Sequence, residues 1–549
     1  MDDQSRESPS EMTRMPLLGL LARVLVLAIG VWVLDRLLYF QGLTSSDEMN
    51  YADVGRQFAG GLGLTQRTFL PGFLRWYDGA RYQQYFVHPP GTPLLLAAAF
   101  KVKGVSEATA ILPAACSFVL SGAALTWLVA VASGRTGLAA LAAVLFCMNG
   151  WSTWYAISAM SEMPHALLVV VCFLVVTLFR GFGGGVFAGA LWGFSYVIRQ
   201  SSILLLPPLA LYVGLEDRRR GERLPQSRMA WAIGFGLAAV AVLVPDAIRE
   251  MHAFGSLGNP FLRSTLLIDT PLGDAGWIFL YGHPAATADP WSYFLAEPQV
   301  LLRKYVELSG YTFRRILPYL LNPTWFCLPL GGLLGLWKGA FRSLKLASLL
   351  ALGLVIVVSP LSFVSGQYYV FLLPLASALS ADSILWGWAR LRVGPLWRRI
   401  VAGVVVVHFA TAPLADTLSF ISGRHVRPGD MVLQAAHRES VRQFFLQNTY
   451  PDEMIVTPLA FLASWVSDRR TMLYAYGHPP SDAPMWAAIQ SRIAIDAIVY
   501  SSLMPQPGDP LLPGFHLVWC QTIDGTEFRL YRRHGSPPPP DVCSRRPGP

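Results

Sequence analysis

Long apolar segments alternate with short polar ones along most of this chain. The first apolar segment, Leu17 to Leu38, is long enough to cross a bilayer core of about 30 Å as a helix. Further apolar segments follow at residues 110–132, 136–150, 163–179, 184–198, 202–215, 230–247, 317–337, 346–364, 368–388 and 400–418. The pattern therefore predicts a polytopic α-helical membrane protein with about eleven transmembrane helices.

Two longer polar stretches, at residues 40–89 and 248–316, interrupt this alternation. The apolar piece Pro90 to Val102 follows the first stretch and is too short to span the hydrocarbon core. We expect it to lie along the membrane interface or to enter the membrane part way. Both polar stretches are predicted to be loops of a transmembrane domain that covers residues 1–424.

Residues 425–549 have a different composition, which predicts a soluble domain. "MIVT" at Met454 to Thr457 and "DAIVYSS" at Asp496 to Ser502 are typical of short strands, with a helical pattern and a further strand between them. "FHLVWCQTIDGTEFRLYRR" predicts a hairpin that turns at Asp524-Gly525. We expect a small α/β domain, followed by a Pro-rich tail ("SPPPPD") that is extended or disordered.

The composition agrees with a membrane protein, because 53% of the residues are hydrophobic and only 14% are charged. A formal net charge of +9 would indicate a nucleic-acid partner in a soluble protein. Here Lys and Arg gather in the short loops between apolar segments, as the positive-inside rule requires. Arg6 and Arg14 precede the first span, so we place the N-terminus in the cytoplasm. Both long loops and the C-terminal domain then lie outside, and no nucleic acid is expected.

Two further features of the sequence bear on this assignment. The first apolar segment exceeds the roughly 7–15 apolar residues of a signal peptide and lacks a cleavage pattern, so we interpret it as a retained helix. Cys520 and Cys543 share the polar C-terminal region and could form a disulfide outside the membrane. The chain shows no internal repeat.

Candidate functional residues gather at the predicted outer ends of the helices. "SSDEMNY", directly after the first span, contains the adjacent carboxylates Asp47 and Glu48. The other candidates lie near later helix ends and are His88, Glu162, Arg199 and Arg249. Each also has an ordinary structural explanation, namely helix capping for the carboxylates, an interfacial position for the histidine and lipid contact for the arginines. Three arginines of the first loop, Arg67, Arg75 and Arg81, are expected to be surface charges.

The order and spacing of these pieces resemble a known superfamily. An acidic pair followed by Tyr-Ala comes after the first span, and "HPP" with an apolar helix follows about forty residues later. An acidic residue then opens a descending helix, "GALWGFSYVIRQSSILLLPP" closes the next span, and "REMHAFGS" precedes a long loop. Over nearly its whole length the chain resembles the GT-C glycosyltransferases, in particular bacterial relatives of protein O-mannosyltransferases and of lipid A aminoarabinose transferases.

This resemblance implies transfer of a sugar from a polyprenyl-phosphate carrier to an envelope acceptor, either a protein, lipid A or a glycan. The implied location is the outer face of the bacterial cytoplasmic membrane. Asp47 matches the family's catalytic carboxylate, with Glu48 beside it, and Glu162 stands where the second acidic residue is often Asp. These families often carry an Arg beside a Tyr near the carrier phosphate, but "SGQYYVFLLP" has Gln367 there. The phosphate-binding candidates are therefore Arg199, Arg249 and His88.

Elementary chemistry is consistent with this implied reaction. An Arg at the membrane surface can neutralise a departing phosphate, and a carboxylate in a partly dry site can deprotonate an acceptor. One principal carboxylate and a good leaving group favour a single displacement with inversion over a retaining mechanism. No D-x-D metal motif is evident, so no cofactor is required, although His88 with a nearby carboxylate could hold a divalent metal.

Two alternatives from other classes stay open at this point. A transporter or flippase of a lipid-linked saccharide would carry ionisable residues within its spans, and Asp382 is a candidate for such a residue. A non-catalytic protein of envelope assembly would share the membrane topology and would not depend on Asp47.

Overall fold

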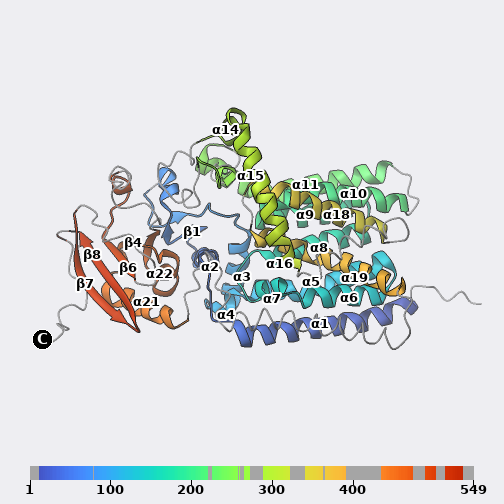
Figure 1. Ribbon diagram of the computed structural model, residues 1–549, viewed down its shortest axis with the longest axis horizontal. Coiled ribbons are helices and arrows are strands. Elements are labelled where there is room, and N and C mark those ends of the chain that lie inside the picture. Colours follow the sequence, from blue (N-terminus) through green and yellow to red (C-terminus); the bar gives the residue numbers. More distant parts are fainter. Residues whose placement is uncertain are drawn as a thin grey trace, which may run out of the picture.

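The chain folds into a helical bundle at one end and a mixed β-sheet with flanking helices at the other (Figure 1). The computed structural model describes residues 11–77, 79–219, 225–256, 265–272, 288–321, 341–362, 365–390, 435–473, 489–501 and 514–533, with residues 259, 487 and 535. The predicted span 400–418, most of the span 317–337 and the Pro-rich tail lie outside these residues. Cys543 does so too, and its disulfide with Cys520 stays a prediction.

The bundle consists of the apolar helices that the sequence predicts. They are α1 (Glu11–Tyr39), α5 (Leu112–Ser133), α6 (Thr136–Cys147), α8 (Glu162–Leu178), α9 (Gly181–Ile198), α10 (Leu206–Arg219), α11 (Pro225–Phe254), α18 (Arg342–Val358) and α19 (Leu373–Arg390). In the described part of the chain, six helices are long and apolar enough to cross a membrane, or seven if the bent pair of α6 and α7 (Gly150–Ala156) counts as one span. A total of eleven spans stays a prediction.

The predicted span 136–150 differs from the structure because the helix breaks. α6 ends at Cys147, and α7 starts at Gly150 with its axis turned by 64°. The side chain of Asn149 accepts hydrogen bonds from the backbone N–H groups of Trp151 and Ser152. This N-cap satisfies donors that a continuous helix would have paired with carbonyls, and so it fixes the bend.

Small residues allow α9 and α11 to approach closely. Gly185, Gly189 and Gly193 lie four residues apart on one face of α9. A Cβ atom at Gly185 or Gly189 would collide with backbone atoms of Trp231 or Phe235 in α11. Such spacing of small residues is typical of helix pairs in membranes, where close van der Waals packing replaces the hydrophobic effect.

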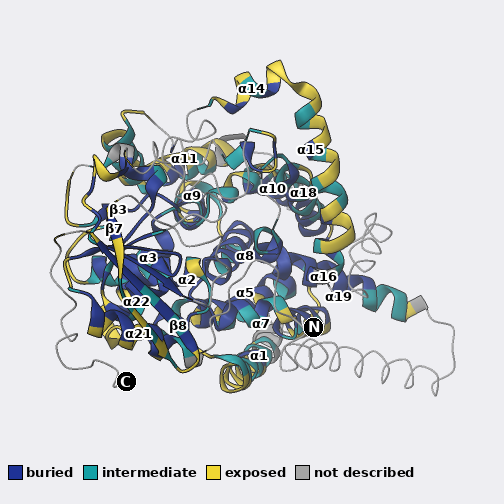
Figure 2. Ribbon diagram, turned by 60° about the vertical axis from the view of Figure 1, so that its left-hand side comes forward, coloured by how far each residue is buried: buried dark blue, intermediate teal, exposed yellow. Residues whose placement is uncertain are grey.

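The surface of the bundle is apolar where lipid would surround it. Leu37 of α1 is 79% exposed and Leu237 of α11 is 61% exposed, and both helices carry further exposed apolar side chains. The buried residues lie between the helices and within the sheet (Figure 2). A soluble protein rarely exposes such extended apolar surface. The structure thus agrees with a multi-pass membrane protein.

Both predicted loops contain regular elements. The first holds α2 (Ser46–Ala59), β1 (Thr65–Gln66), β2 (Thr68–Phe69), η1 (Pro71–Trp76) and β3 (Gln83–Gln84), and it leads into α3 (Gly91–Lys103) and α4 (Glu107–Ala110). In the second, α11 continues beyond residue 247 to Phe254. That stretch also contains η3 (Thr265–Leu267), α14 (Pro290–Ala296), α15 (Pro298–Tyr311) and the π-helical η5 (Thr312–Ile316), which leads into α16 (Leu317–Leu321).

The sheet has six strands in the order β2-β5-β4-β6-β8-β7. Its strands from the C-terminal part are β4 (Met454–Thr457), β5 (Arg470–Leu473), β6 (Ala497–Ser501), β7 (Phe515–Ile523) and β8 (Thr526–Arg533), accompanied by α21 (Ala435–Asn448) and α22 (Ala460–Ser467). The predicted hairpin is confirmed, because β7 and β8 pair antiparallel and turn at Asp524 (φ 48°) and Gly525 (φ 78°). The edge strand β2 comes from the first loop and pairs in parallel with β5, which the sequence did not predict.

Candidate active site

Helix α2 begins with a capping box that involves Glu48. The Ser45 side chain accepts from the backbone N–H of Glu48, and the Glu48 carboxylate accepts from the N–H of Ser45 at 2.9 Å. The same carboxylate accepts from the N–H groups of Thr44 at 2.7 Å and Ala159 at 3.1 Å. Glu48 is buried. Its contacts therefore tie the start of α2 to the chain before it and to the segment before α8.

Asp47, one residue earlier, points elsewhere. Its side chain is 37% exposed, and its Oδ1 atom lies 3.6 Å from Nε2 of His88. The ring of His88 also packs against that of Tyr51, with 5.1 Å between ring centroids. Asp47 and His88, two residues that the sequence proposes for the site, thus lie together.

The surroundings of the two carboxyl groups shift their pKa values in opposite directions. Burial raises the pKa of Glu48, and the hydrogen bonds from Ser45, Thr44 and Ala159 only partly offset this effect. Partial burial acts to raise the pKa of Asp47, but the nearby His88 and the charge of Arg199 lower it below its usual value. Asp47 is therefore the carboxylate that stays ionised more readily.

Arg199 and Glu162 form an ion pair between two helix ends. Glu162 is the first residue of α8, and Arg199 follows α9 directly, before the 3₁₀ turn η2 (Gln200–Leu205). Arg199 Nη1 donates to the Glu162 carboxylate and, at 2.9 Å, to Ser161 Oγ. Its guanidinium lies 4.8 Å from the ring centre of Tyr368 in η7 (Gly366–Leu372). Glu162 thus holds Arg199, whose charge acts on Asp47.

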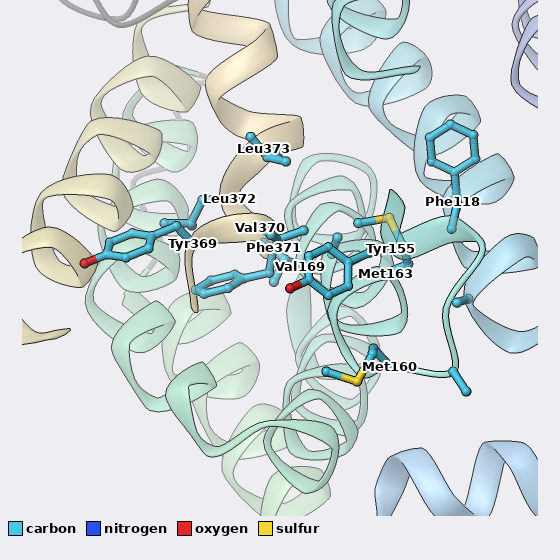
Figure 3. Close-up of a cluster of buried hydrophobic side chains, with 14 of the residues drawn as sticks. Phe118, Tyr155, Met160, Met163, Val169, Tyr369, Val370, Phe371, Leu372 and Leu373 are labelled. Carbon is cyan, nitrogen blue, oxygen red and sulfur yellow. The ribbon is translucent and has the colours of Figure 1, made fainter. Parts of the chain in front are cut away.

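Behind this ion pair, His165 anchors η2 to the bundle. Its Nε2 lies 2.8 Å from Ser202 Oγ, and its ring stacks on Phe371 of η7 with centroids 4.2 Å apart. Figure 3 shows Phe371 and Val370 of η7 in one apolar cluster with Val169 of α8. This packing fixes the segments that carry Arg199 and Tyr368.

Arg249, near the end of α11, contacts the last part of the first loop. Its Nη1 donates to the backbone carbonyl of Tyr85 at 2.6 Å, and its Nε donates to Asp246 at 2.9 Å. The guanidinium also lies 4.8 Å from the ring centre of Phe86. Arg249 therefore orders the segment that ends at His88 and is already engaged by Asp246.

Two tyrosines complete the site, and sequence reasoning missed both as functional candidates. Burial, with Asp47 nearby, raises the pKa of Tyr51 well above its usual value, so its hydroxyl stays a hydrogen-bond donor. Tyr85 is fully buried, and its hydroxyl has no hydrogen-bond partner within the described part of the chain. Burial raises the pKa of Tyr85 most, and the nearby Tyr51 and Asp47 raise it further. In the sequence, Tyr51 stands three positions after Glu48 in "DEMNY", and Tyr85 stands three positions before His88 in "YFVHPP". This closeness to the candidate residues was the signal that could have indicated both tyrosines.

Among the described residues, no group of three or more His, Cys, Asp or Glu side chains is placed to hold a metal ion. His88 and Asp47 provide two donors, so a metal there would need further ligands from a substrate or water. The arrangement offers an ionised carboxylate, a histidine and a held arginine at one end of the bundle. These groups can accept a proton and neutralise an anionic leaving group.

Comparison with known proteins identifies the fold. Residues 87–248 match the family model described as dolichyl-phosphate-mannose-protein mannosyltransferase. The crystal structure of ArnT from Cupriavidus metallidurans bound to undecaprenyl phosphate is 14% identical to the chain. The alignment covers 95% of this chain and 99% of that chain, with a TM-score of 0.58. The chain has the GT-C glycosyltransferase fold.

Two further structures are similar to this chain. The apo form of the same ArnT gives a TM-score of 0.55 at 14% identity and covers 93% of this chain and 98% of that chain. The Archaeoglobus fulgidus oligosaccharyltransferase, in complex with Zn and sulfate, gives a TM-score of 0.51 at 12% identity. That alignment covers 88% of this chain and 68% of the archaeal chain. No curated protein sequence matches the chain.

The comparisons confirm the resemblance expected from the sequence. The matching family model is that of a mannosyltransferase, and the matching structures include an oligosaccharyltransferase and an ArnT with a bound polyprenyl phosphate. They also agree with the predicted enzyme class, a glycosyltransferase that uses a lipid-phosphate-linked donor. The family model covers Glu162, Arg199 and His88 but begins after Asp47.

Proposed function

We propose that this GT-C protein transfers a sugar from a polyprenyl-phosphate carrier to an envelope acceptor, with inversion at the anomeric carbon. The observation that carries the proposal is the position of Asp47. Its Oδ1 atom lies 3.6 Å from Nε2 of His88, and the charge of Arg199 lowers its pKa. The side chain of its neighbour Glu48, by contrast, accepts hydrogen bonds in the helix cap. Of the two adjacent carboxylates, Asp47 is thus the available one, and the charge of Arg199 acts on it, which suits a single displacement.

Asp47 is the general base in the proposed reaction. It accepts the proton of the acceptor hydroxyl or amine as the acceptor atom forms its bond to the anomeric carbon. The bond from that carbon to the phosphate oxygen breaks, and its electron pair stays on the polyprenyl phosphate. Arg199 neutralises the charge that develops on this leaving group, and Glu162 orients Arg199 through their ion pair. His88 keeps Asp47 ionised, and Arg249 orders the segment before His88.

We place this reaction on the outer face of a bacterial cytoplasmic membrane, with the sheet domain also outside. The orientation rests on the basic loops, because a cytoplasmic N-terminus puts Arg135, Arg180 and the run at residues 216–223 on the inner side. The site residues then lie at the outer ends of α8 and α9. The acceptor is a protein, lipid A or a glycan. The proposed chemistry uses no metal, and retention of activity in EDTA tests this point.

The pairing of Asp382 favours the enzyme over a transporter. Asp382 forms an ion pair with Lys345 of α18, and its Oδ1 lies 4.0 Å from Arg135 Nη1. A carboxylate on a proton or ion pathway would need to change its charge during transport. A paired carboxylate instead links α18 and α19 as a structural element.

The experiment is sugar transfer by purified protein in nanodiscs. A panel of synthetic polyprenyl-phosphate sugars is offered to the wild type, to Asp47→Asn and to the control Asp452→Asn, which changes a 76% exposed carboxylate. We expect the wild type and the control to consume one donor and Asp47→Asn to lose turnover while its thermal melting is unchanged. Full activity in Asp47→Asn would remove Asp47 as the base. A wild type that neither binds nor consumes any donor would contradict the proposed function.

A further inference from the structure

The helix that carries Asp47 contacts the C-terminal unit through its last turn and through the segment before its first turn; we define this unit as residues 435–473, 489–501 and 514–533. Asp47 lies in the first turn of α2, and Arg56 lies in its last turn. Helix α2 is largely buried between α3 and α22, with most of its residues inaccessible to solvent. The first predicted loop and the C-terminal unit are therefore one packed structure.

Arg56 joins the last turn of α2 to the end of α22. Its guanidinium donates to the backbone carbonyls of Trp465 and Ser464, both at 3.2 Å. It also pairs with Asp468, the residue that follows α22, at 2.5 Å and lies 4.8 Å from the ring centre of Trp465. A cation at this place neutralises the negative C-terminal end of α22.

Asp53 extends this link to the strand β2. It is 2% exposed, pairs with Arg56 at 2.6 Å and accepts a hydrogen bond from the backbone N–H of Arg67 at 2.8 Å. The Arg67 side chain lies 2.9 Å from Asp468 and is only 16% exposed, so the expectation of a surface charge there was wrong. The next residue, Thr68, pairs with Thr471 of β5. The end of α2 and β2 are thus bound to α22 and β5 together.

A second contact lies just before α2. Gly42 has a φ of +95°, and a Cβ atom there would collide with the side chains of Arg438 in α21 and Glu107 in α4. Arg438 Nη1 donates to the Glu107 carboxylate at 2.6 Å, and Trp465 Nε1 donates to the same oxygen at 2.9 Å. The chain thus passes over this ion pair immediately before the capping box that starts α2.

We propose that Arg56 is a positioning residue for the transfer reaction proposed above, and that through it the C-terminal unit sets the place of Asp47. Asp47 and Arg56 are nine positions apart on one continuous helix, a distance of about 14 Å at 1.5 Å per residue. Because the helix is continuous, a shift at Arg56 is transmitted to Asp47. A misplacement of about 1 Å at a reacting group costs on the order of 10²-fold in rate.

The test compares Arg56→Gln and Arg56→Lys with the control Arg442→Gln, all in the full-length protein in nanodiscs. Arg442 is a half-exposed arginine of α21 in the same C-terminal unit and pairs only with its helical neighbour Glu439 among the ion pairs of the described residues. We expect Arg56→Gln to lose on the order of 10²-fold in kcat per folded molecule, with an unchanged KM for the donor. Arg56→Lys restores part of the loss, because an ammonium keeps the charge but cannot reach all the acceptors of a guanidinium.

A second measurement does not depend on turnover. Amide hydrogen exchange at residues 46–50 becomes faster in Arg56→Gln than in the wild type and in Arg442→Gln, because the first turn of α2 opens more often. If kcat is unchanged in Arg56→Gln, or falls only in proportion to the folded fraction, the proposal is overturned. Unchanged exchange overturns it too. If the wild type has no transfer activity, the proposed function is contradicted instead. The exchange measurement then tests by itself whether Arg56 positions the first turn of α2.

Discussion

Asp47 and Glu48 are neighbours in the first turn of α2, yet Asp47 faces His88 while Glu48 accepts hydrogen bonds from three backbone N–H groups. Consecutive helical residues point about 100° apart, so adjacent carboxylates need not share a task. Their pKa values move in opposite directions for the reasons given above. Groups whose environments separate their pKa values in this way differ in their roles. Two predictions follow directly from this pair.

Replacement of His88 by Gln should move the acidic limb of the pH profile of kcat/KM to higher pH. The nearby His88 lowers the pKa of Asp47, so its replacement raises that pKa. Because the ionised carboxylate is the proposed base, less of it is then available on the acidic side. The measurement is transfer rate against pH, with His252→Gln, an exposed histidine of α11, as the control. An unshifted acidic limb would show that His88 does not tune the base.

Replacement of Glu48 by Gln should lower the stability of the protein more than its turnover per folded molecule. The amide can accept through one oxygen only, so its NH₂ group meets backbone N–H donors that the carboxylate now satisfies. A buried donor left unpaired costs about 1–3 kcal/mol. We expect a lower melting temperature, with turnover per folded molecule retained, whereas Glu439→Gln on the exposed face of α21 changes neither. Loss of turnover at an unchanged melting temperature would instead give Glu48 the catalytic role that the sequence proposed.

Local signals in the sequence predicted the local parts of the fold. "SSDE" reads as a capping box when Ser45 and Glu48 are taken together, and capping was one of the explanations considered for the carboxylates. Asp524-Gly525 specified its hairpin because both residues adopt positive φ values that few other residues tolerate. The helices α8 and α9 begin and end close to the predicted residues for a similar reason, since their apolar runs are bounded by polar ends.

Contacts between segments that are distant in the chain could not be predicted from the sequence. β2 has two residues, and its partner β5 lies some four hundred residues later, so no pattern in either segment could predict the pairing. Arg67 was misjudged for that reason, because its partner Asp468 belongs to the C-terminal unit. The pairing of Arg199 with Glu162 likewise depends on how α8 and α9 pack. The sequence predicted that both residues lie at outer helix ends, but it did not show that their side chains contact each other.

Replacement of Arg199 by Lys should reduce kcat/KM by on the order of 10²–10³-fold, the usual effect of losing one group that stabilises developing charge. Lysine keeps a positive charge but lacks the planar fork that now contacts Glu162, Ser161 and the Tyr368 ring together. Steady-state kinetics with the donor that the panel experiment selects measures the effect, and Arg442→Lys is the matched control. Wild-type kinetics in Arg199→Lys would exclude Arg199 as the group that neutralises the leaving phosphate.

The ion pair of Lys345 and Asp382 gives a prediction that also separates the enzyme from a transporter. Both side chains are buried, with 6% and 11% exposure. Lys345→Met leaves the carboxylate of Asp382 without its main counter-ion, which should cost about 3–5 kcal/mol. The double variant Lys345→Met with Asp382→Leu removes both charges, and apolar replacement of a buried pair is often neutral or stabilising.

Thermal melting in nanodiscs should therefore show a large loss for the single variant and recovery of most of it in the double variant. The double variant should also transfer sugar at the wild-type rate, because among the ion pairs of the described residues Asp382 pairs with Lys345 and Arg135, at the start of α6, and not with the residues grouped around Asp47. A well-folded double variant that has lost function would mean that the charge of Asp382 is needed for the activity itself. A transporter would instead show no sugar transfer by the wild type, and the charge of Asp382 would be needed to move the intact lipid-linked saccharide across the membrane.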